Sequence, residues 1–372
     1  MRFPEFTEEW KNTSLGKIGK TFNGLTGKSG SDFGQGFPYI TYKSIFDNSK
    51  IDISRVEYVE ITDAERKKKT QNEVQYGDIF FTTSSETPDE VGMTSVLLDE
   101  VNDCYLNSFC FGYRLNSLLD TMPEYMRFYL RSWTIRKKMF VLAQGSTRFN
   151  ISKNEVMGMS INIPKVEEQR KIANLLILLE DRIATQIKII DKLESLIRGI
   201  SLHILAKPAN TFIKDCLICN TSALQENQVA ESGEYPVFGA TGVRGYLNTP
   251  QVQQDAILII KDGASVGTVK YAIGKYGVIG TLNYLTPKND YNLKYLYYCL
   301  RIFNFTPFIT GLAIPHIYFR DYGNAKVYCP SIEEQQHIAK NFSNIEYKIA
   351  IEKQVLEKLR EQKNYLLSQM FI

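Results

Sequence analysis

A gapless internal repeat is the feature of this sequence that most constrains its fold. The segment IPKVEEQRKIANLL, which begins at Ile163, aligns with CPSIEEQQHIAKNF, which begins at Cys329, at an offset of 166 residues. The pattern PxxEEQxxIA keeps the same register in both copies. A helical pattern shared by chance would rarely do so, and we therefore predict a duplicated unit.

Each copy of the repeat predicts one long helix, at 167–205 and at 333–371. A proline precedes each helix, glutamates occupy its first turn, where they suit the helix dipole, and no proline interrupts it. Apolar residues recur every seven positions, which is typical of a coiled-coil seam. The rows in the first helix are Leu176, Ile183, Ile190, Ile197, Ile204 and Ile172, Leu179, Gln186, Leu193, Ile200. Those in the second are Phe342, Ile349, Leu356, Lys363, Met370 and Ile338, Ile345, Glu352, Leu359, Leu366.

Two polar residues, Gln186 and Glu352, interrupt the seam at equivalent positions midway along the helices. If the helices pair antiparallel about a pseudo-two-fold axis, these side chains meet and fix the coiled-coil register at some cost in stability. The alternative is that both face solvent. Antiparallel pairing is also the easier topology, because a helix of this length spans about 58 Å at ~1.5 Å per residue. A parallel arrangement would require the intervening chain to bridge that distance.

The sequence before each helix indicates a strand-rich globular half, which makes the expected fold class α+β. Alternating, β-branched and aromatic runs bounded by Gly, Asp or Asn predict strands. They lie at 76–83, 95–100 and 110–116, and at 255–263, 267–273 and 276–287. An amphipathic helix (124–139 and 293–305), a glycine loop (145–152 and 311–318) and a short strand (158–163 and 324–329) follow in each half. The glycine loops share the offset of 166 but differ in residue type, which suits two different targets.

Composition and charge exclude several classes of protein. The start, MRFPEFTEEW, lacks a signal-peptide core, and no stretch approaches the roughly 20 apolar residues of a membrane span. We therefore expect a soluble, cytoplasmic protein with no membrane partner. Six cysteines are too sparse for a disulfide scaffold, and the lone CxxC at Cys216 and Cys219 predicts no metal site. The net charge of +3 does not by itself indicate a nucleic-acid binder.

The chain resembles the specificity subunits of type I restriction–modification systems over essentially its full length. The resemblance rests on the two PxxEEQ segments and on GSTRFNIS (145–152) and GLAIPHIYFRDYG (311–323). It implies two target recognition domains, at 1–163 and 207–329. Two spacer helices, at 164–206 and 330–372, would then form an antiparallel coiled coil with a pseudo-two-fold internal repeat.

The resemblance also implies a function. Each recognition domain would read one half of a bipartite, asymmetric site in double-stranded DNA, while the helices set the spacing and dock two methyltransferase subunits. The chain itself would be non-catalytic and hold no cofactor or metal. S-adenosylmethionine, ATP and magnesium would belong to the methyltransferase and restriction subunits. Because phosphate contacts supply much of the affinity for DNA and this chain is nearly neutral, those partners are expected to provide much of the affinity.

Loop residues with forked donors, amides or hydroxyls are the candidates for DNA contact, because these groups match base edges and phosphates. In the first half they are Lys28, Thr83, Ser84, Ser85, Ser146, Thr147, Arg148 and Asn150. In the second half they are Arg244, Lys261, His316 and Tyr318. For each of them the alternative is an ordinary solvated loop residue.

Two other classes of function are alternatives to a specificity subunit. A stand-alone methyltransferase or nuclease is disfavoured, because the sequence has neither a methyl-donor loop nor an acidic metal-binding cluster. A coiled-coil scaffold whose globular ends bind proteins without reading DNA is the main alternative to the specificity subunit.

Overall fold

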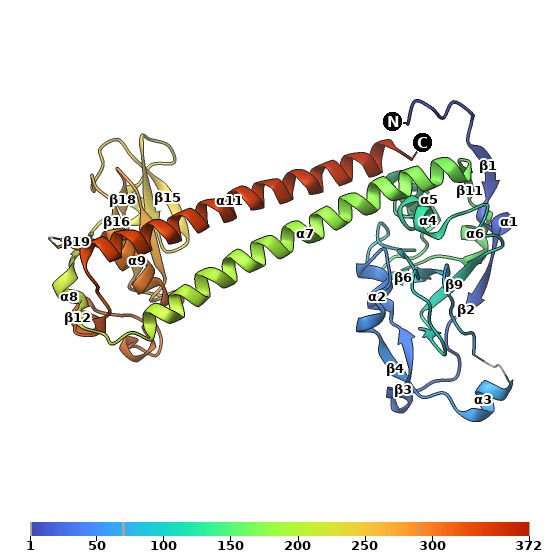
Figure 1. Cartoon of the computed structure of the whole chain (residues 1–372), viewed down its shortest axis with the longest axis horizontal. Helices are drawn as coiled ribbons and strands as arrows, with labels where there is room; N and C mark the ends of the chain where they lie inside the picture. The colour runs from blue at the N-terminus through green and yellow to red at the C-terminus, as the bar shows by residue number, and fades with distance from the viewer. Residues whose placement is uncertain (1, 69–70, 289, 372) are drawn as a thin grey trace. The chain divides into compact units, whose positions relative to one another are not determined.

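The computed structural model describes residues 2–68, 71–288 and 290–371, and it divides into two units (Figure 1). The first unit comprises Met1–Thr185 and Leu356–Ile372, and the second comprises Gln186–Val355. Each unit holds one strand-rich globular part together with a portion of each long helix.

The first globular part is built on a four-stranded antiparallel sheet of order β2-β9-β5-β7. The strands are β2 (Gly19–Asn23), β9 (Cys110–Leu115), β5 (Ile79–Thr82) and β7 (Thr94–Val96). β5 is buried along its whole length and consists of Ile, Phe, Phe and Thr, which are residue types favoured in strands. The sheet therefore forms the centre of this part's core.

A smaller sheet and two strand pairs complete the strands of the first unit. The central β3 (Phe33–Ile40) pairs antiparallel with β4 (Glu57–Val59) and parallel with β8 (Tyr105–Leu106). The two pairs are β1 (Lys11–Ser14) with β11 (Ser160–Ile163), and β6 (Ser84–Ser85) with β10 (Phe149–Asn150). The shorter helices are α1 (Leu15–Ile18), α2 (Tyr42–Asp47), α3 (Asp63–Lys68), α4 (Pro123–Tyr129), α5 (Trp133–Leu142) and α6 (Lys153–Gly158), with 3-10 turns at Gly30–Asp32 and Ile53–Arg55.

The second globular part repeats both sheets and the β1–β11 pair, while the β6–β10 pair is represented there by isolated bridges. Its four-stranded sheet has the order β13-β19-β16-β17, and its smaller sheet has the order β15-β14-β18, again with one antiparallel and one parallel pair. The strands are β13 (Leu217–Thr221), β19 (Leu282–Pro287), β16 (Ala256–Ile260), β17 (Val269–Ala272), β15 (Gly242–Leu247), β14 (Tyr235–Gly239) and β18 (Gly277–Val278). The remaining elements are β12 (Thr211–Phe212) paired with β20 (Lys326–Val327), helices α8 (Ile213–Cys216), α9 (Leu293–Ile302) and α10 (Phe319–Tyr322), and 3-10 turns at Glu226–Gln228 and Thr306–Phe308. The predicted internal repeat is therefore confirmed, and it extends to the sheets.

The two long helices, α7 (Val166–Leu205) and α11 (Ile332–Gln369), begin and end within two residues of their predicted bounds. In the first unit, the start of α7 and the end of α11 share one core, in which Ile172 and Leu176 lie with Leu366 and Met370. In the second unit, β12 just after α7 pairs with β20 just before α11, so the end of α7 and the start of α11 lie together. The pairing is antiparallel, as predicted.

The structure differs from the sequence-based expectation in two elements. The run 124–139, predicted as one helix, is two helices, because Ser132 adopts an extended conformation (φ −66°, ψ 154°) between α4 and α5. The break lets the Arg131 side chain reach backbone carbonyls outside the helix. The run 276–287, predicted as one strand, is β18 and β19, which belong to different sheets.

Candidate nucleic-acid interface

The two glycine loops close with the same backbone hydrogen bonds. In the first unit, the N–H groups of Gln144 and Asn150 donate to each other's carbonyl oxygens over 2.9 and 2.8 Å. In the second unit, Thr310 and His316 do the same over 2.9 and 2.8 Å. Because both pairs are related by the offset of 166, the repeat preserves the loop geometry and not only the sheets.

A glycine with positive φ opens each loop. Gly145 has a φ of 135° and Gly311 a φ of 89°. A Cβ atom at Gly145 would collide with the carbonyl oxygen of Arg148, and one at Gly311 would collide with that of Ile314. Only glycine therefore fits either position without strain.

Both loops are fixed to the ends of equivalent strands. The N–H of Ile151 donates to the carbonyl of Thr83 over 3.0 Å, and the N–H of Ile317 donates to the carbonyl of Lys261 over 2.9 Å. Thr83 directly follows β5, and Lys261 directly follows β16. Each loop is thus held on the central sheet of its unit, which gives its tip a defined position.

The structure gathers seven of the eight candidate residues of the first half around this loop. The loop contributes the exposed side chains of Ser146, Thr147, Arg148 and Asn150, and the neighbouring strand end contributes Thr83, Ser84 and Ser85. The Thr83 hydroxyl donates to the carbonyl of Phe109 over 2.8 Å, and Ser85 is buried against Glu90. The exposed loop residues are therefore better placed for an external contact than Thr83 or Ser85.

A surface hollow of about 460 Å³ adjoins the loop. It is lined by Tyr42, Phe46, Ser84, Ser85, Glu86, Glu90, Phe109 and Arg148. The rings of Tyr42 and Phe46 stack with centroids 5.9 Å apart, and Phe109 is 67% exposed. These aromatic residues were not predicted from the loop pattern, because they come from α2 and from the turn before β9 rather than from the glycine loop.

Three candidates of the second half also lie together at the other loop. Lys261 precedes Asp262, whose backbone forms an isolated antiparallel β-bridge with that of His316. The ring centroids of His316 and Tyr318 lie 5.0 Å apart, and the ring planes are inclined at 69°. The guanidinium of Arg320 lies 4.6 Å from the centre of the Tyr318 ring. The sequence analysis did not single out Arg320, although it follows the loop by a few residues.

The remaining two candidates lie elsewhere and are paired. Lys28 forms an ion pair of 2.7 Å with Glu65, and its side chain is only 8% exposed. Its hydrogen bond lowers the pKa of Glu65 to about 2. Arg244 pairs with Glu226 and donates to the hydroxyl of Thr241. A phosphate would have to compete with a carboxylate at both sites, so their assignment to DNA contact stays a prediction with less support than the loops.

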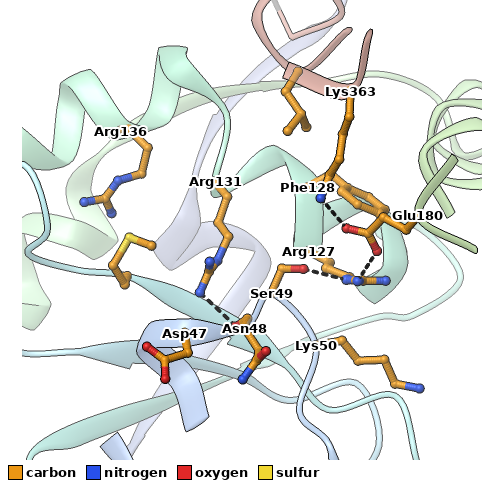
Figure 2. A pocket seen from close by; sticks show the side chains of 12 residues that line it. Asp47, Asn48, Ser49, Lys50, Arg127, Phe128, Arg131, Arg136, Glu180 and Lys363 are labelled. Atoms are coloured by element: carbon orange, nitrogen blue, oxygen red, sulfur yellow. Dashed lines mark hydrogen bonds and ion pairs between the residues drawn. The ribbon is translucent and has the colours of Figure 1, made fainter. Parts of the chain in front are cut away.

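A second hollow in the first unit, of about 520 Å³, contains three arginines that sequence reasoning missed (Figure 2). Arg131 donates to the backbone carbonyls of Thr94, Ile45, Phe46 and Asn48. Burial lowers the pKa of Arg131 to about 10. Arg127 pairs with Glu180 of α7, which also accepts from Lys363 of α11 over 2.7 Å. Arg127 thus joins the globular part to α7, whereas Arg131 and Arg136 hold segments within the globular part through backbone carbonyls.

The glutamine of the repeated EEQ motif performs the same task in both units. Gln169 and Gln335 are buried, and the Oε1 atom of each accepts the backbone N–H at the start of the amphipathic helix, from Met122 and Asn292 respectively. The Nε2 atom of each donates over 2.9 Å to the carbonyl of the proline before the long helix. The motif therefore fixes the start of each long helix against its globular part.

The two polar residues of the seam meet in the second unit. Gln186 is 5% exposed, and its side-chain amide donates to the backbone carbonyl (3.2 Å) and to the carboxylate of Glu352. Lys348 pairs with the same carboxylate over 2.6 Å, and these two contacts hold the pKa of Glu352 below its usual range. The seam thus contains one polar layer, whose role in fixing the register stays a prediction.

No group of three or more His, Cys, Asp or Glu side chains suited to a metal ion occurs among the described residues. Within the same part of the chain, no helix is long and apolar enough to cross a bilayer.

Comparison with protein-family models matches two regions of the chain, 7–195 and 212–361, to the type I restriction modification DNA specificity domain. The chain belongs to this family. One domain of the type I specificity family therefore covers most of each half, in agreement with the repeat. Among curated relatives, the chain is similar to the putative type I restriction enzyme MjaX specificity subunit of Methanocaldococcus jannaschii, with 26% identity over 98% of this chain and 93% of that protein.

Solved structures show the same fold. The S subunit of a type I restriction-modification system from M. genitalium matches with a TM-score of 0.63 and 15% identity, over 100% of this chain and 99% of that one. The HsdS subunit from Thermoanaerobacter tengcongensis matches with a TM-score of 0.52 and 18% identity, over 100% and 98%. At these identities, the type I specificity fold is the common element.

Proposed function

We propose that this type I specificity subunit reads a bipartite, asymmetric site in double-stranded DNA, with each globular part reading one half. The observation that supports this proposal is the pair of equivalent glycine loops. Each is fixed to the end of an equivalent central strand, and the two carry different side chains at their tips. A constant frame with variable loops suits the reading of two different base sequences, because specificity resides in contacts to base edges.

The long helices are assigned two tasks in this proposal, which are setting the gap between half-sites and docking two methyltransferase subunits. Exposed apolar side chains on both helices support the docking role, since apolar side chains exposed to solvent favour burial against a partner protein. They include Leu178, Leu196 and Leu202 of α7 and Tyr347 and Tyr365 of α11. The chain would be non-catalytic and act in the cytoplasm, and the S-adenosylmethionine, ATP and magnesium would bind to the methyltransferase and restriction subunits.

The test is methylation mapping of a genome in cells with and without this gene, together with reconstitution. A complex of the chain with its methyltransferase subunits is expected to methylate one split site, and the chain alone with S-adenosylmethionine is expected to methylate nothing. Methylation by the purified chain alone would overturn the non-catalytic assignment.

The scaffold alternative, in which the globular parts bind proteins only, makes a different prediction. It requires that the complex with methyltransferase subunits binds no duplex DNA more tightly than the methyltransferase subunits alone. Gel-shift titration at low salt distinguishes the two, because the electrostatic part of DNA binding is strongest there.

A further inference from the structure

The tip of the second glycine loop is apolar where the first is polar. Residues 312–314 are Leu-Ala-Ile, and they occupy the positions that Ser-Thr-Arg occupies at 146–148. Leu312 is fully exposed (107%) and Ile314 is 65% exposed. A single exposed leucine is ordinary on a protein surface, but two large apolar side chains on one short tip form a contact surface rather than a scatter.

The apolar tip is held away from the body of the second unit. The backbone pair between Thr310 and His316 closes the loop, and the N–H of Gly263 donates to the carbonyl of Pro315 over 2.9 Å. A side chain at Gly311 would collide with the carbonyl of Ile314, so the turn that precedes the tip requires this glycine, as the first loop requires Gly145. The tip therefore presents Leu312 and Ile314 outward from the end of β16.

Polar and cationic groups flank the tip. Lys261 and His316 lie at its base, and Arg320 lies beside Tyr318 two residues further along the chain, where it also forms an exposed ion pair of 3.8 Å with Asp321. The combination is an apolar centre with cations near it. Such a surface suits duplex DNA, because cations contact phosphates while the centre meets the base edges.

We propose that Leu312 and Ile314 read the second half-site through apolar contact with the C5 methyl group of thymine in the major groove. This inference rests on the proposed function. Of the groups that base pairs expose in the major groove, the thymine methyl is the apolar one, and all others are hydrogen-bond donors or acceptors. An aliphatic side chain pressed against a G·C edge would leave those polar groups without partners.

The first loop supplies the contrast. Arg148, at the position of Ile314, offers the forked donors that match guanine. The two half-sites are therefore read by different chemistry at equivalent positions, hydrogen bonding in the first and methyl contact in the second.

The test replaces thymine by deoxyuridine, which lacks the C5 methyl, at one position at a time in the mapped site. Binding by the intact complex with its methyltransferase subunits is measured for each duplex. At least one substitution in the second half-site is expected to weaken binding about fourfold, the effect of removing one methyl contact. The double variant Leu312→Ala with Ile314→Ala is expected to be insensitive to that same substitution.

The control is Ile273→Ala, which removes an exposed aliphatic side chain of the same unit just after β17 and should leave the deoxyuridine effect unchanged. Both alanine changes in the second loop are at exposed positions, and circular dichroism checks that the fold is kept. A second half-site without a sensitive thymine, or equal sensitivity in the double variant, would overturn the inference. So would a strong fluorescence increase from 2-aminopurine placed next to the sensitive thymine and away from the methylated base, which would instead show a wedge inserted between bases. If no bipartite site is found at all, the proposed function itself fails.

Discussion

At the scale of single residues, buried polar side chains decide how each globular part joins its helix. Gln169 accepts one backbone N–H and donates to two carbonyls, those of Asp120 and Pro164. A buried amide with three partners is stabilising only while all of them are satisfied, because a buried polar group left without a partner is costly. The glutamine of the EEQ motif therefore has a structural role in joining the helix to the globular part.

Replacing Gln169 by alanine is expected to destabilise the first unit by about 1–3 kcal/mol, since it leaves the N–H of Met122 and two carbonyls without their partner. Thermal unfolding followed by circular dichroism measures the change. Glu167→Ala is the matched control, because Glu167 lies in the same helical turn but is exposed. Equal melting temperatures for the two variants would show that the glutamine contacts contribute nothing.

Arg148 belongs to the same scale, and the proposed function assigns it to recognition instead of stability. Arg148→Ala is expected to relax specificity at one position of the first half-site and to weaken binding there by roughly 10- to 100-fold, the worth of a good bidentate base contact. Methylation mapping of the reconstituted complex measures this change. Lys137→Ala removes an equal charge from exposed α5 and should leave the recognised sequence unchanged. A change confined to the second half-site would contradict the assignment of this loop.

At the scale of elements, the long helices follow the seven-residue pattern closely, and one polar layer interrupts it. Gln186 and Glu352 satisfy each other at a position where leucine would pack. A polar residue in a coiled-coil seam lowers stability but excludes other registers. Gln186 and Glu352 are thus expected to lower the stability of the helix pair while fixing its register.

This trade is measurable with three variants. Glu352→Leu alone is expected to lower the melting temperature, because it removes the carboxylate partner of the buried Gln186 amide and leaves it only the backbone carbonyl. Gln186→Leu combined with Glu352→Leu is expected to restore or raise it, since an apolar pair fits the seam. Glu357→Leu, at an exposed position of α11, controls for added hydrophobicity. A double variant less stable than Glu352→Leu would rule out the trade.

The elements also show what sequence alone could predict. The helices, the central strands and the glycine loops were predictable, because periodicity, glycine and the offset of 166 are local or repeated signals. The break at Ser132 was not, since it occurs where Arg131 contacts carbonyls that lie more than 80 residues earlier in the chain, and such contacts leave no local signal. The pairing of Lys28 with Glu65 and the aromatic hollow at Tyr42 were missed for the same reason, because each joins distant segments.

At the scale of the whole molecule, duplication supports the proposal that one chain reads an asymmetric site. Both halves keep the same sheet order, the same loop closure and the same glutamine contacts, while the loop tips differ. The sheets and loop bases are therefore constrained by core packing and backbone hydrogen bonds, whereas the exposed loop tips are not. Changes at the tips can alter a half-site without disturbing the core on which they rest.

The long helices should then act as a ruler that is independent of both tips. Inserting one heptad beside Gln186 in α7 and one beside Glu352 in α11 keeps the seam in phase and lengthens each helix by about 10 Å. At ~3.4 Å per base pair, the gap between half-sites is expected to grow by about three base pairs, with both half-sites unchanged. Methylation mapping reads both quantities in one experiment. A heptad inserted in α7 alone is the control, because it separates Gln186 from Glu352 and should instead destabilise the helix pair. Altered half-sites with an unchanged gap would show that spacing is set by another part of the complex.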